Sequence, residues 1–198
     1  MGTNRDQLLE SDRLRVRFWF CEDRYAHEVW LAVGGSWIVV LASVEGSPSE
    51  DWPASPPLQS LHFERLGMAN QSALLVGMAG KSHWSASIEL DPTGNCARFD
   101  IACRVRGAIK PMLASTYRAM PGVSVLKTKD GKIEFRAMPQ GNVSLELSSH
   151  DEPPRTSIEL VEGKTRIFAG DPAESDLSRT VRWRYTLRAI DGPTAPDR

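Results

Sequence analysis

The stretch 83–106, HWSASIELDPTGNCARFDIACRVR, decides the fold of this chain. Apolar and polar side chains alternate along it in two runs. The apolar positions are Trp84, Ala86, Ile88 and Leu90 in the first run and Ala97, Phe99, Ile101, Cys103 and Val105 in the second. A side-chain period of two is typical of a strand with one buried face, and the segment Asp91–Asn95 between the runs is rich in turn residues. The stretch therefore predicts a β-hairpin.

The pairing of the two strands follows from the same pattern. If Trp84 lies opposite Cys103, apolar residues meet apolar residues along one face of the hairpin. On the other face the same register pairs His83 with Arg104, Ser87 with Asp100 and Glu89 with Arg98. Cross-strand pairs of this kind each contribute roughly 0.2–1 kcal/mol, and a slip of one residue would move every side chain of one strand to the wrong face. We therefore predict this register.

The same alternation recurs along the rest of the chain and gives about twelve strand candidates, with hairpin signals such as Gly34-Gly35 and Asp130-Gly131 between them. No helix longer than about three turns is expected. This pattern predicts an all-β, antiparallel protein, either a two-sheet sandwich or a closed barrel. We favour the sandwich, because several strands have a polar second face that suits an outer, solvated sheet surface.

In length and strand number the chain is similar to the large sugar-binding sandwiches of the galactose-mutarotase type, an analogy of fold that no sequence motif accompanies. The segment Gly34–Trp37 superficially resembles the Gly-x-Trp motif of the lipocalins, but it lies in the third predicted strand rather than the first. We expect one sandwich domain over residues 13–190, between a flexible lead at 1–12 and a flexible tail at 191–198. Residues 46–58 contain four prolines and are predicted to form a loop.

Composition narrows the classes of function. The net charge of −1 over 198 residues gives no general attraction to nucleic acid or membranes, and no apolar run approaches the ~20 residues of a membrane span. The three cysteines are scattered without a CxxC pair, so neither a disulfide framework nor a common zinc site is expected. Without a signal peptide at the start, the expected location is the cytoplasm. GxSxG, P-loop and GxGxxG motifs are absent, and no cofactor or metal is expected.

The polar face of the hairpin is the first candidate site. It carries His83, Ser85, Ser87, Glu89, Asp100 and Arg104. Such a face suits a hydroxylated ligand, or an acid–base set in which His83 acts with Glu89 or Asp100. His83 and Glu89 lie about 20 Å apart along one strand and cannot act on one bond, whereas His83 and Arg104 suit a single anion. The alternative is a solvated face with cross-strand ion pairs.

Aromatic and basic residues give two further candidates. Among six tryptophans, Trp19 and Trp52 are not predicted on a core face and are candidates for stacking on a sugar, whereas the other four are predicted to be buried (Trp30, Trp37, Trp84 and Trp183). Arginines alternate in the first and last long strands, at 13–17 and 182–188. If those strands pair, their arginines would form a surface for an anionic polymer; otherwise each stripe pairs with acidic residues.

These features support three functional hypotheses. The first is non-catalytic ligand binding, with carbohydrate or another small hydroxylated molecule as the ligand and Trp19, Trp52, His83 and Arg104 at the site. The second is a small sugar isomerase or mutarotase that uses a histidine and a carboxylate. The third is a structural protein that forms homo-oligomers through its edge strands. A cavity holding a histidine and a carboxylate within about 5–6 Å would favour the enzyme, and a flat, open polar face would favour binding.

Overall fold

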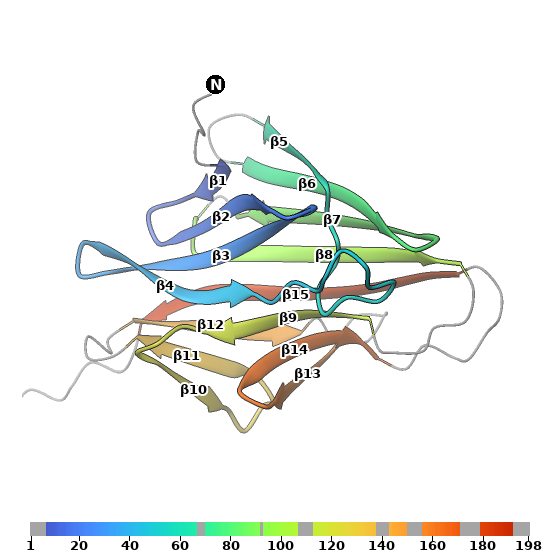
Figure 1. Cartoon of the computed structure of the whole chain (residues 1–198). Helices are drawn as coiled ribbons and strands as arrows, with labels where there is room; N and C mark the ends of the chain where they lie inside the picture. Colours follow the sequence, from blue (N-terminus) through green and yellow to red (C-terminus); the bar gives the residue numbers. More distant parts are fainter. Residues whose placement is uncertain are drawn as a thin grey trace, which may run out of the picture.

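The computed structural model describes residues 7–66, 70–91, 93–106, 113–137, 143–149, 156–170 and 179–191. These residues form two antiparallel sheets that pack as a sandwich and contain no helix (Figure 1). The smaller sheet has the order β1-β2-β3-β4-β9-β14-β13, and the larger has the order β10-β11-β12-β15-β8-β7-β6-β5. The all-β, antiparallel two-sheet prediction is confirmed, with fifteen strands in the described part of the chain where about twelve were predicted.

The strands of the smaller sheet are β1 (Gln7–Glu10), β2 (Leu14–Cys21), β3 (Arg24–Val33), β4 (Ser36–Ser43), β9 (Ala114–Ala119), β13 (Thr156–Val161) and β14 (Lys164–Ala169). Those of the larger sheet are β5 (Ser60–Leu66), β6 (Asn70–Ala79), β7 (Ser82–Leu90), β8 (Cys96–Val105), β10 (Val123–Lys127), β11 (Ile133–Ala137), β12 (Val143–Ser149) and β15 (Arg179–Asp191). Neighbours in sequence mostly pair as hairpins. Strand β15 is an exception, because it lies between β8 and β12 and pairs with both.

The predicted hairpin forms β7 and β8, and its register is confirmed. Trp84 lies opposite Cys103, and His83 lies opposite Arg104. The apolar face is buried between the sheets; Ile88, for example, is 2% exposed. The polar face of the hairpin points away from the core. Burial of an apolar side chain of this size contributes about 1.5–3 kcal/mol, so the alternation alone fixes which face of the hairpin meets the smaller sheet.

Part of the predicted flexible lead is a strand. Residues Gln7–Glu10 form β1, which pairs with β2 at the edge of the smaller sheet, and Leu9 is buried in the core. This apolar anchor explains why the polar segment is held against the sheet. Residues 1–6 of the predicted lead and residues 192–198 of the predicted tail lie outside the described part of the chain.

Three aromatic residues are not where the alternation predicted them. Trp30 and Trp37 lie on the outer face of the smaller sheet and are half-buried, because the core face of β3 is filled by Val29 and Leu31. The Arg15 guanidinium covers the Trp37 ring at 4.3 Å from its centroid, a cation–π contact that shields the ring from water. The alternation that buries Leu14, Val16 and Phe18 also predicts an inward position for Phe20, which is instead 55% exposed, at the end of β2.

The two arginine stripes do not form one surface. The first lies on β2 in the smaller sheet and the second on β15 in the larger. Arg15 pairs with Glu10, and Arg182 and Arg184 both pair with Asp100. The alternative reading of the stripes, as cross-strand ion pairs, therefore describes these arginines.

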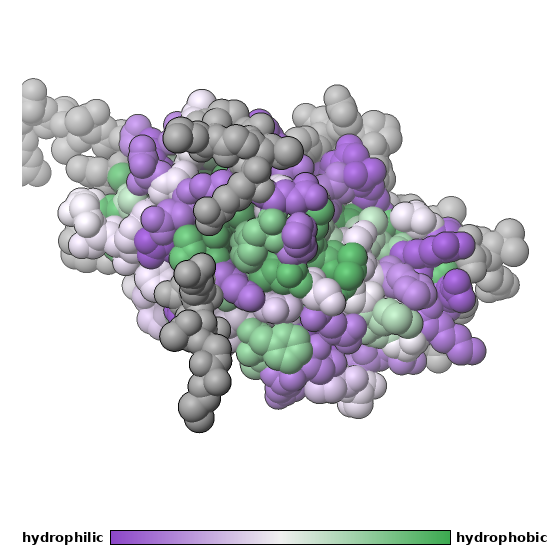
Figure 2. Space-filling view, turned by 90° about the horizontal axis from the view of Figure 1, so that it is seen from above, coloured by the Kyte–Doolittle hydropathy of each residue, from purple (hydrophilic) through white to green (hydrophobic). Residues whose placement is uncertain are grey.

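The view from above shows the side of the sandwich where β1, β5 and β6 lie (Figure 2). Apolar residues gather in the middle of this view, and hydrophilic residues surround them. Among the described residues, the largest cluster of exposed apolar side chains on one strand is Leu74, Val76 and Met78 of β6. Three such side chains on consecutive outward positions make the outer face of β6 apolar, although it lies in a mainly polar surface.

Candidate functional site

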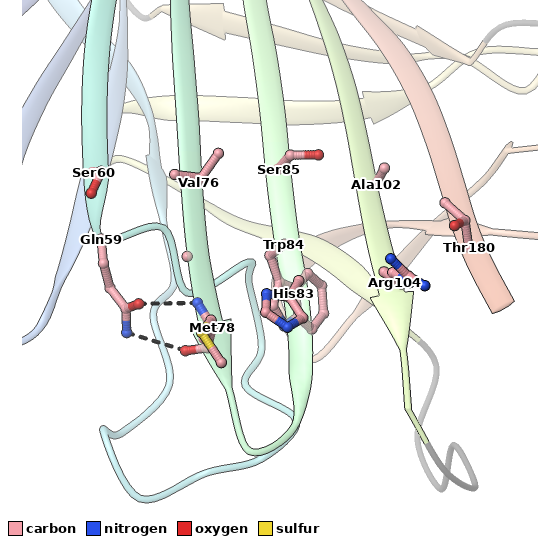
Figure 3. Close-up of a pocket in the computed structure, with 11 residues that line it drawn as sticks. Gln59, Ser60, Val76, Met78, His83, Trp84, Ser85, Ala102, Arg104 and Thr180 are labelled. Carbon is pink, nitrogen blue, oxygen red and sulfur yellow. Dashed lines mark hydrogen bonds between the residues drawn. The ribbon is translucent and has the colours of Figure 1, made fainter. Parts of the chain in front are cut away.

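An open groove of about 610 Å³ crosses the outer face of the larger sheet near one end of β6, β7 and β8 (Figure 3). The described residues that line it are Gln59, Ser60, Val76, Gly77, Met78, His83, Trp84, Ser85, Ala102, Arg104 and Thr180. They come from five neighbouring strands or their immediate flanks. The groove volume falls within the range of about 300–1,000 Å³ that is usual for small-molecule sites.

The sequence produces this groove through two kinds of outward residue. On β6 the outward positions are apolar, and Val76 at 55% and Met78 at 46% exposure reach into the solvent. On β7 and β8 the neighbouring outward positions hold the short side chains of Ser85 and Ala102. Short residues beside longer ones leave a depression on an otherwise continuous sheet surface.

Basic groups stand together along one side of the groove. His83 and Arg104 are directly opposite each other on β7 and β8, and both are exposed (Figure 3). Among the described residues that line the groove, none is acidic. The Arg104 guanidinium makes no hydrogen bond or ion pair to any other residue that the structure describes, in contrast to Arg182 and Arg184 farther along the face. An anion at this position would therefore meet an unneutralised guanidinium.

At the edge of the groove, the side-chain amide of Gln59 bonds to the backbone of Met78 as a neighbouring strand would. The Met78 backbone N–H donates to Gln59 Oε1 at 3.0 Å, and Gln59 Nε2 donates to the Met78 carbonyl oxygen at 3.1 Å (Figure 3). These bonds satisfy both backbone groups of Met78 at a point just before β5 begins. These bonds connect the β6 end of the groove to the segment that leads into β5.

The structure separates the predicted site residues into two groups. His83, Ser85 and Arg104 line the groove, whereas Ser87, Glu89 and Asp100 do not. The Ser87 hydroxyl donates to Glu89 Oε1 at 3.3 Å. Asp100 accepts hydrogen bonds from Arg182 and from Arg184 Nε, the latter at 2.9 Å. The three predicted acid–base candidates, His83, Glu89 and Asp100, are therefore not assembled into one set.

Neither predicted stacking tryptophan lies at the groove. Trp19 is half-buried on the outer face of the smaller sheet, opposite Ala26. Trp52 lies in the loop at 46–58, is partly buried and packs against the core, and the side chain of the neighbouring Asp51 approaches Gly80. The prolines around Trp52 favour this packed arrangement over a free lid, because they limit the conformations of the loop.

Several lining residues were missed by sequence reasoning, in particular Gln59, Ser60, Val76, Met78 and Thr180. The available signal was the segment SALLVGMA at 72–79, which is apolar at consecutive positions and thus on both faces of a strand. An apolar outward face on a strand that has no covering layer marks an exposed patch.

A second polar cluster lies inside the sandwich. His27 Nε2 is 2.7 Å from the Tyr117 hydroxyl, which is 2.6 Å from the Tyr185 hydroxyl. The His27 ring is packed between Phe18 and Phe99, with both ring centroids at 5.9 Å. Burial lowers the pKa of His27 to about 4 and raises the pKa of both tyrosines, for Tyr117 well above its ordinary value. This chain of groups is consequently uncharged at neutral pH.

Glu45 and His27 both line a small gap inside the sandwich. The carboxyl group of Glu45 is only partly hydrogen-bonded. Its Oε2 is buried and has no hydrogen-bond partner among the described residues. Burial raises the pKa of Glu45 to about 7, although the nearby Ser43 and Arg24 act in the opposite direction. The gap that Glu45 and His27 share has a volume of about 20 Å³, which is room for one water molecule.

Within the described residues, no cluster of three or more His, Cys, Asp or Glu side chains is placed to hold a metal ion. The described residues likewise include no helix with the length and apolar character needed to cross a membrane.

Comparison with known proteins supports the fold. No protein-family model matches the chain, and no curated protein matches its sequence. A solved structure, the heparan sulfate lyase HepC from Pedobacter heparinus, is similar with a TM-score of 0.55 and 8% identity. The match covers 97% of this chain and 37% of the lyase, so this chain spans little more than a third of that protein's length. At this identity the likeness concerns the fold alone: this chain is similar in fold to part of that lyase.

Proposed function

We propose that this protein binds a carbohydrate bearing an acidic group, and that the groove on the outer face of the larger sheet is its binding site. The observation that carries the proposal is the pair His83 and Arg104, adjacent across β7 and β8 beside an open groove in which no described lining residue is acidic. A guanidinium without an acidic partner is the group best suited to bind a carboxylate or sulfate in two parallel hydrogen bonds.

The remaining lining groups match the other parts of a sugar. Ser60, Ser85 and Thr180 offer hydroxyls for hydrogen bonds to sugar hydroxyls. Val76 and Met78 offer an apolar surface for the C–H face of a sugar ring. The similar solved structure belongs to an enzyme named for a sulfated substrate, heparan sulfate, which agrees with an acidic ligand.

Binding without catalysis fits the groove better than isomerase or mutarotase chemistry. A sugar isomerase of the kind considered above needs a carboxylate near its histidine, and the described lining of the groove supplies none beside His83. The internal gap does bring His27 and Glu45 together, but its volume of about 20 Å³ is far too small for a sugar ring.

The test is direct binding of glycans to the wild-type chain and to two arginine variants. Isothermal titration with heparan sulfate oligosaccharides, hyaluronan oligosaccharides and neutral dextran oligosaccharides compares sulfate, carboxylate and uncharged ligands. We expect at least one acidic series to bind and dextran to bind much more weakly. Arg104→Ala should weaken binding about 10–100-fold, the range expected for a hydrogen bond to a charged group.

The matched control is Arg98→Ala. Arg98 lies on the same face of β8 as Arg104 and outside the groove. Its loss should change affinity by less than about threefold, because a distant exposed charge is largely screened. Absence of binding to every acidic glycan, or equal losses in the two variants, would overturn the proposal.

A further inference from the structure

We infer, on the basis of the proposed function, that the ligand is an extended oligosaccharide that lies across the strands rather than along them. Its path is a trough that begins at Ser60 on β5, crosses Val76 and Ser85, and reaches Ala102 on β8. The acidic group of the sugar is held at the side of this trough by Arg104 and His83.

The strand registers place these residues in a straight row. Ser60 is opposite Val76, Val76 is opposite Ser85, and Ser85 is opposite Ala102. Figure 3 shows the four side chains side by side across the sheet, with Met78, His83 and Arg104 in the next row toward the strand ends. Each row runs perpendicular to the strands, because directly opposed residues of antiparallel strands lie on the same line.

The row is a trough because most of the side chains that flank it are longer than its own. On β6, Val76 lies between Leu74 and Met78, which have longer side chains and are both exposed. On β7, Ser85 has His83 on one side, and on β8, Ala102 has Arg104 on the same side. A chain-shaped ligand therefore finds its lowest path across the sheet through Val76, Ser85 and Ala102.

The trough has one closed end and one open end. On β15, Arg182 is opposite Ala102 and is tied to Asp100, which also binds Arg184. This ion-paired group blocks the path beyond β8. At the other end Ser60 is exposed on β5, an edge strand of the sheet. Three strand spacings separate β5 from β8, about 14 Å in total, which is the length of about three linked sugar rings.

The position of Arg104 indicates where along the oligosaccharide the acidic group lies. Arg104 lies beside the closed end of the trough, next to Ala102 and Thr180. An acidic sugar ring at this end would place its carboxylate or sulfate against the guanidinium. The rings that follow toward β5 would meet Ser85, Val76 and Ser60, none of which is charged. One acidic group near one end of a short oligosaccharide is therefore sufficient for recognition.

Chain length is the first test. Titration with di-, tetra- and hexasaccharides of the acidic glycan that binds best should show affinity rising about tenfold from the disaccharide to the tetrasaccharide, and less than about threefold beyond it. A free acidic monosaccharide that binds as tightly as the tetrasaccharide would overturn the trough and leave the proposed function intact. Failure of every acidic glycan to bind would instead remove the proposed function itself.

Blocking the trough is the second test. Ala102→Trp should abolish tetrasaccharide binding, and Ser85→Phe, at a fully outward position, should do the same by filling the next place in the row. The control is Arg98→Trp, which adds an equally large ring to the same face of β8 outside the trough. Unchanged unfolding temperatures show that all three variants fold, and normal tetrasaccharide affinity in both trough variants would overturn the inference.

Discussion

At the scale of single residues, two buried ionisable groups contribute opposite terms to the pH dependence of the stability of this protein. The pKa of His27 is lowered from 6.5 to about 4, so the unfolded chain takes up a proton at a higher pH than the folded chain. This term reduces stability as the pH falls from 6.5 toward 4. The pKa of Glu45 is raised from 4.5 to about 7, so the folded chain holds its proton longer. That term reduces stability as the pH rises from 4.5 toward 7.

The two terms oppose each other between about pH 4.5 and 6.5, and single variants should separate them. In Glu45→Gln the glutamate term is removed, and the free energy of unfolding should rise by about 1–3 kcal/mol more than in the wild type between pH 4.5 and 6.5. In His27→Asn the histidine term is removed, and the free energy of unfolding should fall relative to the wild type by a similar amount between pH 4.5 and 6.5. Urea titrations across this range measure both slopes. Identical pH profiles for the wild type and both variants would contradict the assignment.

At the scale of elements, a glycine allows one segment to cross a strand. Gly77 is on the core side of β6, opposite Trp84, and a Cβ at this position would lie 1.9 Å from the Pro57 carbonyl oxygen. The chain that enters β5 therefore passes directly over the backbone of β6. Close approach of two backbones is a recognised reason for glycine inside a strand, and here it sets where β5 joins the sheet and where the groove ends.

Substitution of this glycine tests the crossing. Gly77→Ala should lower the free energy of unfolding by about 3 kcal/mol, because the added carbon would clash with backbone atoms of Pro57 and Leu58. The control is Gly131→Ala, where φ is +81° and no atom lies within 4 Å of the added carbon. That variant should cost only the backbone strain, about 1–2 kcal/mol. Equal midpoints of urea unfolding for the two variants would show that the Pro57 contact has no effect.

At the scale of the whole molecule, hydroxyl groups connect the two sheets. Tyr117 and Ser115 lie on β9 of the smaller sheet, and Tyr185 and Trp183 lie on β15 of the larger. The two tyrosine hydroxyls are 2.6 Å apart, and Trp183 Nε1 donates to Ser115 Oγ at 3.0 Å. All four side chains are buried. These bonds fix how the sheets are placed relative to each other, which apolar packing alone specifies less strictly.

A double-mutant cycle measures this connection. Tyr117→Phe and Tyr185→Phe should each lower the free energy of unfolding by about 1–3 kcal/mol, because each leaves a buried hydroxyl without its partner. The double variant should cost less than the sum, with a coupling of about 1 kcal/mol. Ser144→Ala, which removes a hydroxyl donor to Glu134 on other strands, should combine additively with Tyr185→Phe. Strict additivity for the tyrosine pair would contradict the proposed link between the sheets.

The sequence by itself determined the elements that depend on local alternation. The β7–β8 hairpin, its register and the outward position of His83, Ser85 and Arg104 could all be predicted from residues 83–106. The reason is that a slip by one residue would turn the apolar face of one strand outward, and the pairing of Glu89 with Arg98 favours this register over those shifted by two residues. The loop at 46–58 was likewise predictable from its prolines, which exclude a central strand.

Only the tertiary structure decided which strands became neighbours and which faces were covered. Nothing in the local pattern of β15 indicates that it inserts between β8 and β12, and Trp30 and Trp37 looked like core residues until the covered face of their sheet was known. The groove depends in the same way on β5, β6 and β15 lying beside the hairpin. Alternation in the sequence indicates that a strand has one apolar and one polar face. Which face of a strand is covered by the other sheet depends on contacts between residues far apart in the chain, and these contacts form only when the whole core packs.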